Sequence, residues 1–524
     1  MKPLILAVCL VLAVPLSAQV SVTTSRNNNS RNGQNLNETV LTPANVNVTQ
    51  FGKLFSQAVD GYVYAQPLYV PNVSIPGLGT HNVVYVATEH DSVYAFDADN
   101  NTGLNASPLW HTSFINPSKG ITTVSSGDVS CGDLIPEIGI TSTPVIDSNT
   151  QTMFVVAKTK ENGDYFQRLH ALNMTTGAEQ TNSPVVIQAQ VKGSGDGSVN
   201  GVVKFDPFRE AQRPGLLLVN QTLYIGWASH CDIGPYHGWV LSYDEATLKK
   251  TRVFNTTPNG GLGGVWQSGT GLASDGSSIF FATGNGTYDG PKGGTDYGDS
   301  VIKLPVSAGP LDYFTPFDQG SFDDADVDVG SGGVLLLPDQ GSGAPHQHLL
   351  LQVGKSGSIY LINRDRLGRF NSKSNQIVQD LENAIGGLWA TPGWWNNNVY
   401  FGGQYDYLRQ YTFDSGTGLL STVAAALSPT FFGFPGPTPA ISANGTNDAI
   451  LWALQTDQYA SNGATILHAY DATNIANELY NSNQNKSRDN PGQAVKFTVP
   501  TIANGKVYVP TATKLSVYGL LTGR

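Results

Sequence analysis

The segment from Val83 to Gly103, VVYVATEHDSVYAFDADNNTG, contains the pattern that decides the fold. It opens with the β-branched and aromatic run Val83–Val86, and a polar turn follows at Glu89–Asp91. The run Ser92–Phe96 then alternates between apolar and polar positions before a second turn begins at Asp97. Two short strands separated by a polar turn predict one β-hairpin.

The same hairpin pattern recurs at intervals of roughly 40 to 60 residues, a spacing typical of propellers and other repeat arrays. We count eight units, of which the later seven begin near Met153, Leu223, Ile279, Leu349, Val399, Ile450 and Lys506. Each unit has a preceding strand, such as Gln66–Val70, and several have a fourth. Four antiparallel strands form a propeller blade, and a blade is stable only when its neighbours cover its faces. The sequence therefore predicts an all-β, eight-bladed β-propeller of four-stranded antiparallel blades.

The two ends of the repeat array are incomplete in a complementary way. The last unit runs out after its third strand, at Tyr518, whereas Phe51–Ser56 forms an extra strand ahead of the first full unit. We expect this N-terminal strand to complete the last blade and so close the ring.

Outside the repeats, residues 1–18 resemble a secretory signal peptide, with Lys2, an apolar core and a small-residue cleavage site. Cys9 lies inside that core rather than after a small residue, which argues against a lipoprotein. Residues 19–50 are rich in Asn and predict an N-terminal arm, either extended over one face or disordered. Residues 51–524 form the single propeller domain. Residues 375–384 have the apolar spacing of one short helix.

Composition limits the partners that the protein can have. The formal net charge of -11 argues against nucleic acid and anionic membrane surfaces. No later segment is apolar enough to predict a membrane span, so we expect a secreted or periplasmic protein that is a monomer. Once the signal is removed, Cys131 and Cys231 are the remaining cysteines. They could form a disulfide in an oxidising compartment or remain two buried thiols.

The repeats resemble those of the quinoprotein (PQQ) dehydrogenase-like propellers. The best copy of the family's turn is Phe96–Gly103 followed by Trp110, and Phe413–Gly418 and Tyr470–Thr473 are weaker copies. The resemblance covers most of residues 50–520. It implies a quinone in the central axis on a Trp floor, a Ca²⁺ ion held by carboxylate and Asn oxygens, an Asp general base, and a Lys or Arg beside the quinone oxygens.

Several residues match these roles in the family's order. Trp266 resembles the floor, Lys355 the cationic contact, and Trp389 a Trp at the axis. Packing between blades, or an ordinary hairpin position for Lys355, is the alternative for each. The resemblance makes these three residues candidate quinone-binding residues. It rests on motifs alone, and a shared fold does not by itself establish a function.

The acidic candidates centre on residues 318–328. The resemblance makes Asp324 or Asp326 the candidate base, and it makes Asn285, Asp324 and Asp328 candidate calcium ligands. Glu137 is a further candidate carboxylate ligand, although no family motif surrounds it. The alternatives are an Asn-Gly hairpin turn at Asn285 and a solvated acidic loop.

Two departures from the family pattern weigh against a working site. The chain has no adjacent Cys-Cys pair, which many alcohol-oxidising members carry beside the quinone, and no Cys-x-x-Cys-His motif, so we expect no haem. The segment His230–Trp239 contains two His, a Cys and an Asp, and it could be a metal site or a structural loop joined to Cys131.

The sequence thus supports two functions. The first is a non-catalytic binding or scaffold module whose partner is an envelope protein or a glycan. The alternative is a PQQ- and calcium-dependent dehydrogenase of alcohols or sugars. An axis filled with side chains would favour the first, whereas an open, polar cavity on a Trp floor would favour the second.

Overall fold

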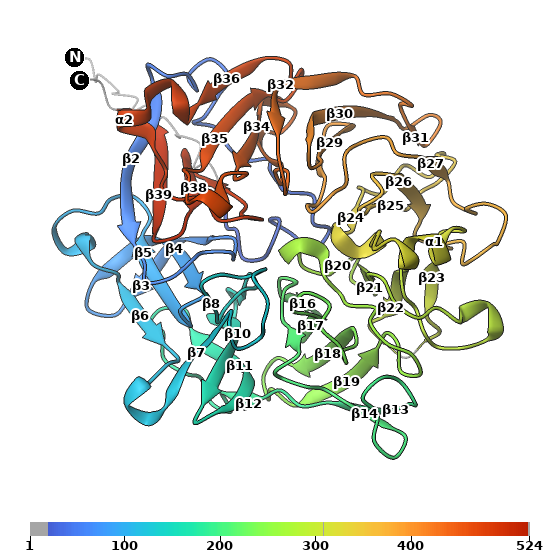
Figure 1. Cartoon of the computed structure of the whole chain (residues 1–524). Coiled ribbons are helices and arrows are strands. Elements are labelled where there is room, and N and C mark those ends of the chain that lie inside the picture. Colours follow the sequence, from blue (N-terminus) through green and yellow to red (C-terminus); the bar gives the residue numbers. More distant parts are fainter. Residues whose placement is uncertain (1–18, 308, 522–524) are drawn as a thin grey trace, which may run out of the picture.

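The computed structural model describes residues 19–307 and 309–521, so the predicted signal peptide lies outside the described residues. Eight small antiparallel sheets surround a central axis, as Figure 1 shows. The predicted propeller is confirmed. The hairpin predicted within Val83–Gly103 is formed by β4 (Gly79–Thr88) and β5 (Ser92–Asp97) of blade 1.

Each blade has four principal strands, which follow one another from the axis to the outer edge of the ring. Blades 1 to 4 comprise β3 (Leu68–Ile75), β4, β5 and β6 (Trp110–Ser113); β9 (Val145–Asp147), β10 (Thr152–Glu161), β11 (Asp164–Asn173) and β12 (Val185–Val186); β16 (Leu217–Val219), β17 (Thr222–Ser229), β18 (Trp239–Asp244) and β19 (Lys250–Asn255); and β20 (Ala273–Ser274), β21 (Ser278–Ala282), β22 (Val301–Pro305) and β23 (Asp312–Phe314).

The second half of the ring repeats this order. Blades 5 to 8 comprise β24 (Leu335–Leu336), β25 (Leu349–Val353), β26 (Ile359–Asn363) and β27 (Gln379–Leu381); β28 (Gly393–Trp395), β29 (Asn398–Gly402), β30 (Asp406–Asp414) and β32 (Ala426–Phe432); β33 (Ala440–Asn444), β34 (Asn447–Gln455), β35 (Ile466–Asp471) and β36 (Glu478–Asn481); and β37 (Thr501–Ala503), β38 (Lys506–Pro510), β39 (Lys514–Leu520) and β2 (Phe51–Ala58).

Short elements decorate the ring. They are β7 (Ile121–Ser125), β8 (Glu137–Ile138), β13 (Gln190–Lys192), β14 (Val202–Lys204), β15 (Glu210–Ala211), β31 (Leu419–Leu420), α1 (Gln319–Asp324), α2 (Lys486–Asp489) and several single 3₁₀ turns. None of the described helices has the length and apolar character that a membrane span requires.

The hydrophobic core is divided among the interfaces between blades. Between blades 2 and 3, for example, Phe154 and Leu169 pack with Ile225 and Trp227. Similar clusters lie between the other neighbouring blades. Each sheet therefore depends on its neighbours for burial, as the repeat pattern predicted.

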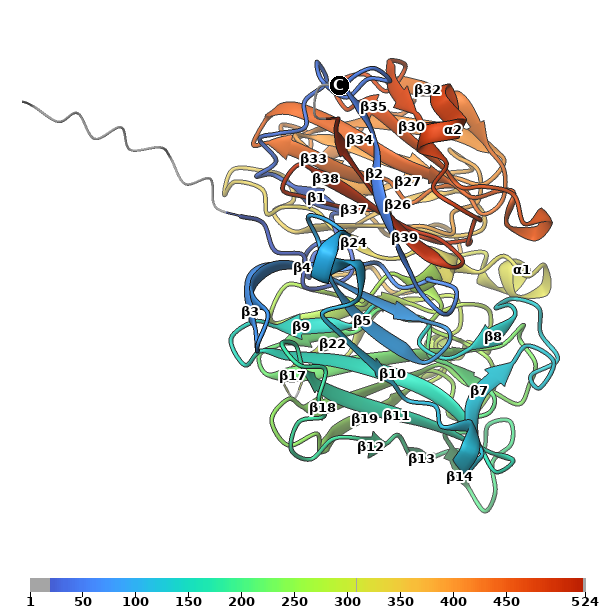
Figure 2. The same cartoon turned by 90° about the vertical axis from the view of Figure 1, so that its left-hand side faces the viewer.

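The N-terminal strand closes the ring. β2 pairs antiparallel with β39, and the two strands lie side by side in Figure 2. Phe51 at its start is fully buried, and its ring centroid lies 5.0 Å from that of Tyr480 and 5.5 Å from that of Trp452. The predicted closure is confirmed, and it also joins blade 8 to blade 7 through aromatic contacts.

The helix predicted at residues 375–384 is wrong. Gln379–Leu381 forms strand β27, which pairs with β26, and the backbone N–H of Val378 donates to the carbonyl of Leu361. Blade 5 needs an outer strand at this place, and its ladder bonds outweigh a weak helical spacing.

Residues 22–35 of the N-terminal arm lie inside the ring, whereas Leu36 and Val40 farther along the arm are exposed. Residues 22–35 bond to the innermost part of one blade after another: Val22 with Tyr69, Thr23 with Ile146, Asn29 with Leu218 and Ser274, Ser30 with Leu336, Asn32 with Trp394, Gly33 with Ile441, and Asn35 with Ile502. The arm, which includes β1 (Gln34–Asn35), therefore contacts all eight blades; it is the dark blue chain at the centre of Figure 1.

Two buried arginines anchor the arm. Arg26 donates to the carbonyls of Pro439 (2.5 Å) and Pro392 (3.0 Å), and Arg31 donates to those of Leu272 (2.9 Å) and Ser25 (2.7 Å). Burial lowers the pKa of each guanidinium to about 9, so both remain charged at neutral pH. A buried charge needs such acceptors, which fixes the arm in one position.

Closure of the ring by β2 can be tested with one substitution. Phe51→Ala should lower the free energy of unfolding by about 3–5 kcal/mol, because it leaves a cavity between the last two blades. Leu54→Ala, in the same strand but with its side chain 39% exposed, is the matched control and should change stability by no more than about 0.5 kcal/mol. Urea denaturation measures both, and equal effects would contradict a buried, ring-closing role for Phe51.

Candidate functional site

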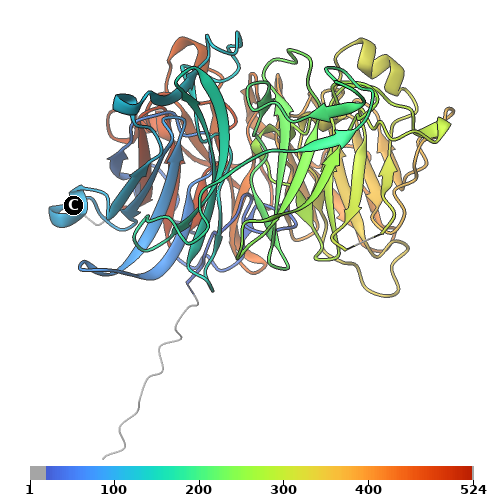
Figure 3. The same cartoon turned by 90° about the horizontal axis from the view of Figure 1, so that it is seen from below.

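An axial cavity of about 300 Å³ opens among the loops that lead into the inner strands of blades 2 to 8. It is lined by Gly132, Asp133, Arg213, Cys231, Asp232, Trp266, Ser268, Asp328, Ser331, Lys355, Trp389, Phe434 and Phe497. Most of these residues precede the inner strands, whereas Cys231, Asp232 and Lys355 lie in loops that join the second and third strands of blades 3 and 5. The arm bonds to the inner strands themselves. In Figure 3 the dark blue arm lies toward the face opposite the yellow helix α1.

Polar contacts separate the cavity from the arm. Ser268 at the cavity wall donates its hydroxyl to the carbonyl of Ser331 (2.6 Å). The hydroxyls of Thr270 and Thr391 lie 2.6 Å apart, and the carbonyl of Thr391 accepts a bond from Arg26 (3.3 Å). The arm thus supports the floor of the cavity.

One wall of the cavity is acidic. Lys355 Nζ lies 2.7 Å from Asp326 and 2.6 Å from Asp328. Burial alone would lower the pKa of Lys355, but the carboxylates of Asp328 and Asp326 outweigh it, and the pKa is raised. Lys355 is therefore a cation held between two carboxylates, so this wall carries a net negative charge.

Asn285 completes the acidic wall. Its backbone N–H donates to Asp328 Oδ1 (2.7 Å), and its side-chain amide donates to Asp326 (2.9 Å). The side-chain oxygen of Asn285 is buried and has no hydrogen-bond partner. A buried carbonyl oxygen without a partner costs free energy, which a ligand at this position would recover.

Aromatic side chains provide the flat surfaces of the cavity. Trp266 lies at one side, and glycines at 264 and 284 allow its close approach, since a Cβ at either position would lie 3.0–3.1 Å from the indole. Trp389 packs edge-to-face on Phe434, with ring centroids 5.4 Å apart. The surface suits a planar ligand.

The opposite wall is cationic. Asp133 lies 2.7 Å from Arg213 and 2.6 Å from Lys496, so two cations share one carboxylate. Burial opposes ionisation of Asp133, but Arg213 and Lys496 outweigh it and hold its pKa well below the usual range. The guanidinium of Arg213 also lies 4.4 Å from the ring centroid of Phe497 and 5.6 Å from that of Trp266. Net positive charge therefore faces the acidic wall across an aromatic space.

A disulfide lies at the cavity. Cys131 and Cys231 are bonded, with their Cα atoms 5.8 Å apart, and Cys231 lines the cavity. This settles the alternatives for the segment 230–239 in favour of a disulfide-linked loop, because a bonded sulfur is no thiolate ligand. His230 is buried against Lys158 Nζ (2.7 Å), and His237 bonds to Thr257.

The structure brings most of the predicted site residues together. Trp266, Trp389, Lys355 and Asp328 line the cavity, and Asn285 and Asp326 contact them. Two predicted ligands lie elsewhere.

Glu137 and Asp324 do not line the cavity. Glu137 accepts bonds from His90 (2.9 Å) and Thr123 (2.7 Å) between blades 1 and 2. Asp324 is an exposed residue at the end of α1. Neither carboxylate forms a hydrogen bond with Asn285, whose partners are Asp328 and Asp326.

Sequence reasoning missed the cationic wall. Asp133, Arg213 and Lys496 come from three distant segments, and none belongs to a recognisable motif. The one sequence feature that could have indicated this wall is the position of Asp133, two residues after Cys131.

The residues present fit a quinone better than they fit a metal ion alone. The Asn285 oxygen and the Asp328 carboxylate are oxygen ligands of the type that Ca²⁺ prefers. However, the described residues contain no group of three His, Cys, Asp or Glu side chains that could hold a metal ion. Further ligands would have to come from a bound molecule or from water. A planar, anionic ligand between the aromatic surfaces fits the remaining features.

Fold and cavity together define an eight-bladed β-propeller with a cavity on its axis, and solved structures of two quinoprotein dehydrogenases share this fold. The quinohemoprotein alcohol dehydrogenase ADHIIG from Pseudomonas putida HK5 superposes with a TM-score of 0.62 at 15% identity, over 96% of this chain and 81% of that one. A europium-containing methanol dehydrogenase superposes with a TM-score of 0.58 at 12% identity, over 95% of this chain and 98% of that one. No family model and no curated protein matches the sequence. At these identities the likeness shows the fold.

The charge arrangement of the cationic wall leads to a pH prediction. Asp133→Asn should lower the free energy of unfolding at pH 7 by roughly 1–3 kcal/mol, because Arg213 and Lys496 lose their shared carboxylate. Asp133 has a lowered pKa in the folded state, so its contribution is present above the ordinary Asp value of about 4 and is lost as the pH falls below it.

The stability difference between wild type and Asp133→Asn, followed by denaturation from pH 7 to pH 3, should therefore be constant at first and shrink below about pH 4. Asp324→Asn, an exposed carboxylate, is the control and should show neither effect. A difference that grows on acidification would overturn this account of the wall.

Proposed function

We propose that this protein is an exported PQQ- and calcium-dependent dehydrogenase of alcohols or sugars. The observation that carries the proposal is the axial cavity, in which Trp266, Asp328 and Lys355 surround one space beside the unpartnered oxygen of Asn285. The axis is open at this level rather than filled with side chains, which favours the enzyme over a passive scaffold.

The proposal assigns each side chain a task. When bound, the quinone would accept the two electrons that the substrate loses. Trp266 would hold its flat face, and the Asn285 oxygen with the Asp328 carboxylate would contribute to a calcium site. Asp328, rather than Asp324, is the candidate base, because it faces the cavity and can accept the proton of a substrate hydroxyl.

Lys355 and the cationic wall would orient the reactants. Lys355 bonds to Asp328 and so fixes the position of that carboxylate. Arg213 and Lys496 share a single negative partner and can therefore also attract an anionic cofactor. The Cys131–Cys231 disulfide agrees with a secreted or periplasmic location, since disulfides persist in oxidising compartments.

A second candidate is a binding module, and an exposed surface on blade 6 favours it. Tyr407 and Phe431 lie opposite each other on β30 and β32 and are 39% and 49% exposed, with ring centroids 5.5 Å apart. Leu427 on the same pair of strands is also exposed. Such a surface is typical of contact with a protein or a glycan.

Reconstitution tests the dehydrogenase. The purified protein, incubated with PQQ and CaCl₂ and then desalted, should retain quinone absorbance and reduce a dye in the presence of an alcohol or sugar from a panel. Asp328→Asn keeps a side-chain oxygen that can contact calcium but lacks the base, so it should retain the quinone and lose turnover by about 10²–10⁴-fold. Asp324→Asn is the matched control and should behave as wild type. If no quinone is retained, the dehydrogenase is excluded and the binding module stands.

A further inference from the structure

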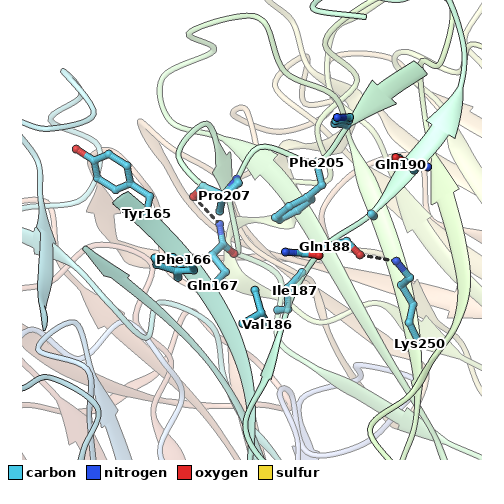
Figure 4. A pocket seen from close by; sticks show the side chains of 12 residues that line it. Tyr165, Phe166, Gln167, Val186, Ile187, Gln188, Gln190, Phe205, Pro207 and Lys250 are labelled. Atoms are coloured by element: carbon cyan, nitrogen blue, oxygen red, sulfur yellow. Dashed lines mark hydrogen bonds between the residues drawn. The ribbon is translucent and has the colours of Figure 1, made fainter. Parts of the chain in front are cut away.

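A second hollow, of about 560 Å³, lies at the outer edge of the ring between blades 2 and 3, far along each blade from the axis. We call it the blade 2–3 groove; Figure 4 shows its side chains. One side is formed by Tyr165–Gln167 of β11, and the other by residues 186–190 and Lys204–Phe205. None of these residues belongs to the axial cavity.

The strand that borders the groove has an incomplete outer edge. β11 runs for ten residues, but its outer neighbour β12 pairs only with Arg168 and Leu169. The carbonyl of Gln167 accepts one more bond, from the N–H of Ile187, after which the chain turns away. Backbone groups two residues apart point to the same side of a strand. The N–H and C=O of Tyr165 therefore point outward into the groove.

The floor of the groove is preformed. The side chain of Gln167 donates to the carbonyls of Glu210 (2.7 Å) and Pro207 (3.1 Å) and accepts from the indole of Trp227 (2.7 Å). Phe205 packs edge-to-face on the same indole, with ring centroids 5.2 Å apart. A rigid floor lowers the entropic cost of binding a ligand.

The rim of the groove is basic. Lys204 and Lys250 are exposed, and neither forms an ion pair with another described residue. Lys250 donates to the carbonyl of Gln188 across the groove, as Figure 4 shows. The rim therefore carries positive charge, although the chain as a whole has a net charge of -11. The charge complementary to this rim is negative.

We propose that the groove docks an extended, acidic segment of a partner protein, which adds a short strand to the open edge of β11. Strand addition satisfies the outward backbone groups of Tyr165, and acidic side chains of the segment meet Lys204 and Lys250.

The observations favour a peptide over an anionic glycan. Sugars bind to open aromatic faces, but the ring of Tyr165 packs on Phe208 at 4.5 Å and that of Phe166 is covered by the guanidinium of Arg168 at 4.8 Å. An open strand edge is complementary to another backbone. This inference is independent of the cofactor, because it concerns a different part of the ring.

The probe is a short fluorescein-labelled peptide in which Glu alternates with Val, titrated against the full chain by fluorescence anisotropy. We expect binding that weakens roughly tenfold in the Lys204→Glu/Lys250→Glu double variant. Lys292→Glu with a second exposed reversal, Lys119→Glu, is the matched control, since both lysines lie on other loops, and it should leave the affinity unchanged.

Two further measurements identify the mode of binding. A peptide with Pro in place of each Val lacks the N–H groups of a strand and should not bind. Hydrogen exchange at the Tyr165 amide should slow when the Glu–Val peptide is bound. Equal binding by the Pro peptide, displacement by alginate with unchanged exchange at Tyr165, or no loss in the double variant would each overturn the proposal.

Discussion

Eight sheets arranged around an axis leave a channel whose inner strands each have an unpaired edge, and in this protein the N-terminal arm fills that channel. Its residues bond in turn to all eight blades, and Arg26 and Arg31 donate hydrogen bonds from their guanidinium groups to backbone carbonyls. Because a buried cation is tolerated only where acceptors surround it, the position of the arm and the spacing of the blades determine each other.

The axial cavity follows from this constraint. The arm occupies the level of the inner strands, so the cavity lies among the loops beyond those strands and has its floor on the side of the arm. The Thr270–Thr391 contact and the bond from Arg26 to Thr391 connect this floor to the arm. Above it, the ring brings together carboxylates, cations and indoles from segments that are far apart in the sequence. A closed ring thereby produces a small volume with opposite charges on its two walls.

The sequence predicted those features of the fold that depend on local patterns of residues. Strand alternation and turns predicted the blades, and the missing strand of the last unit predicted closure by Phe51–Ser56, which the structure extends to Ala58. The family motifs located Trp266, Asn285 and Lys355. They made Asp324 or Asp326 the candidate base and Asp328 a candidate calcium ligand, because several carboxylates fall within one short segment and the motif does not separate their roles. The sequence predicted the arm but not its place inside the ring, because Arg26 and Arg31 bond to backbone carbonyls, which leave no periodic signal in the sequence. The spacing of Ile377 and Leu381 suits a helix as well as an outer strand. The segment forms a strand because the outer edge of blade 5 is otherwise unpaired. Asp133, Arg213 and Lys496 meet only because the ring closes.

Hydrogen exchange of the backbone amides in the arm tests the central claim most directly. If residues 22–35 hold the eight blades together, the amides of Val22 and Gly33 should exchange only when the whole ring unfolds, at rates close to those of the inner strands they contact. Exchange in the arm that is as fast as in exposed loops, while the blades remain protected, would show that the ring stands without it and would contradict this account.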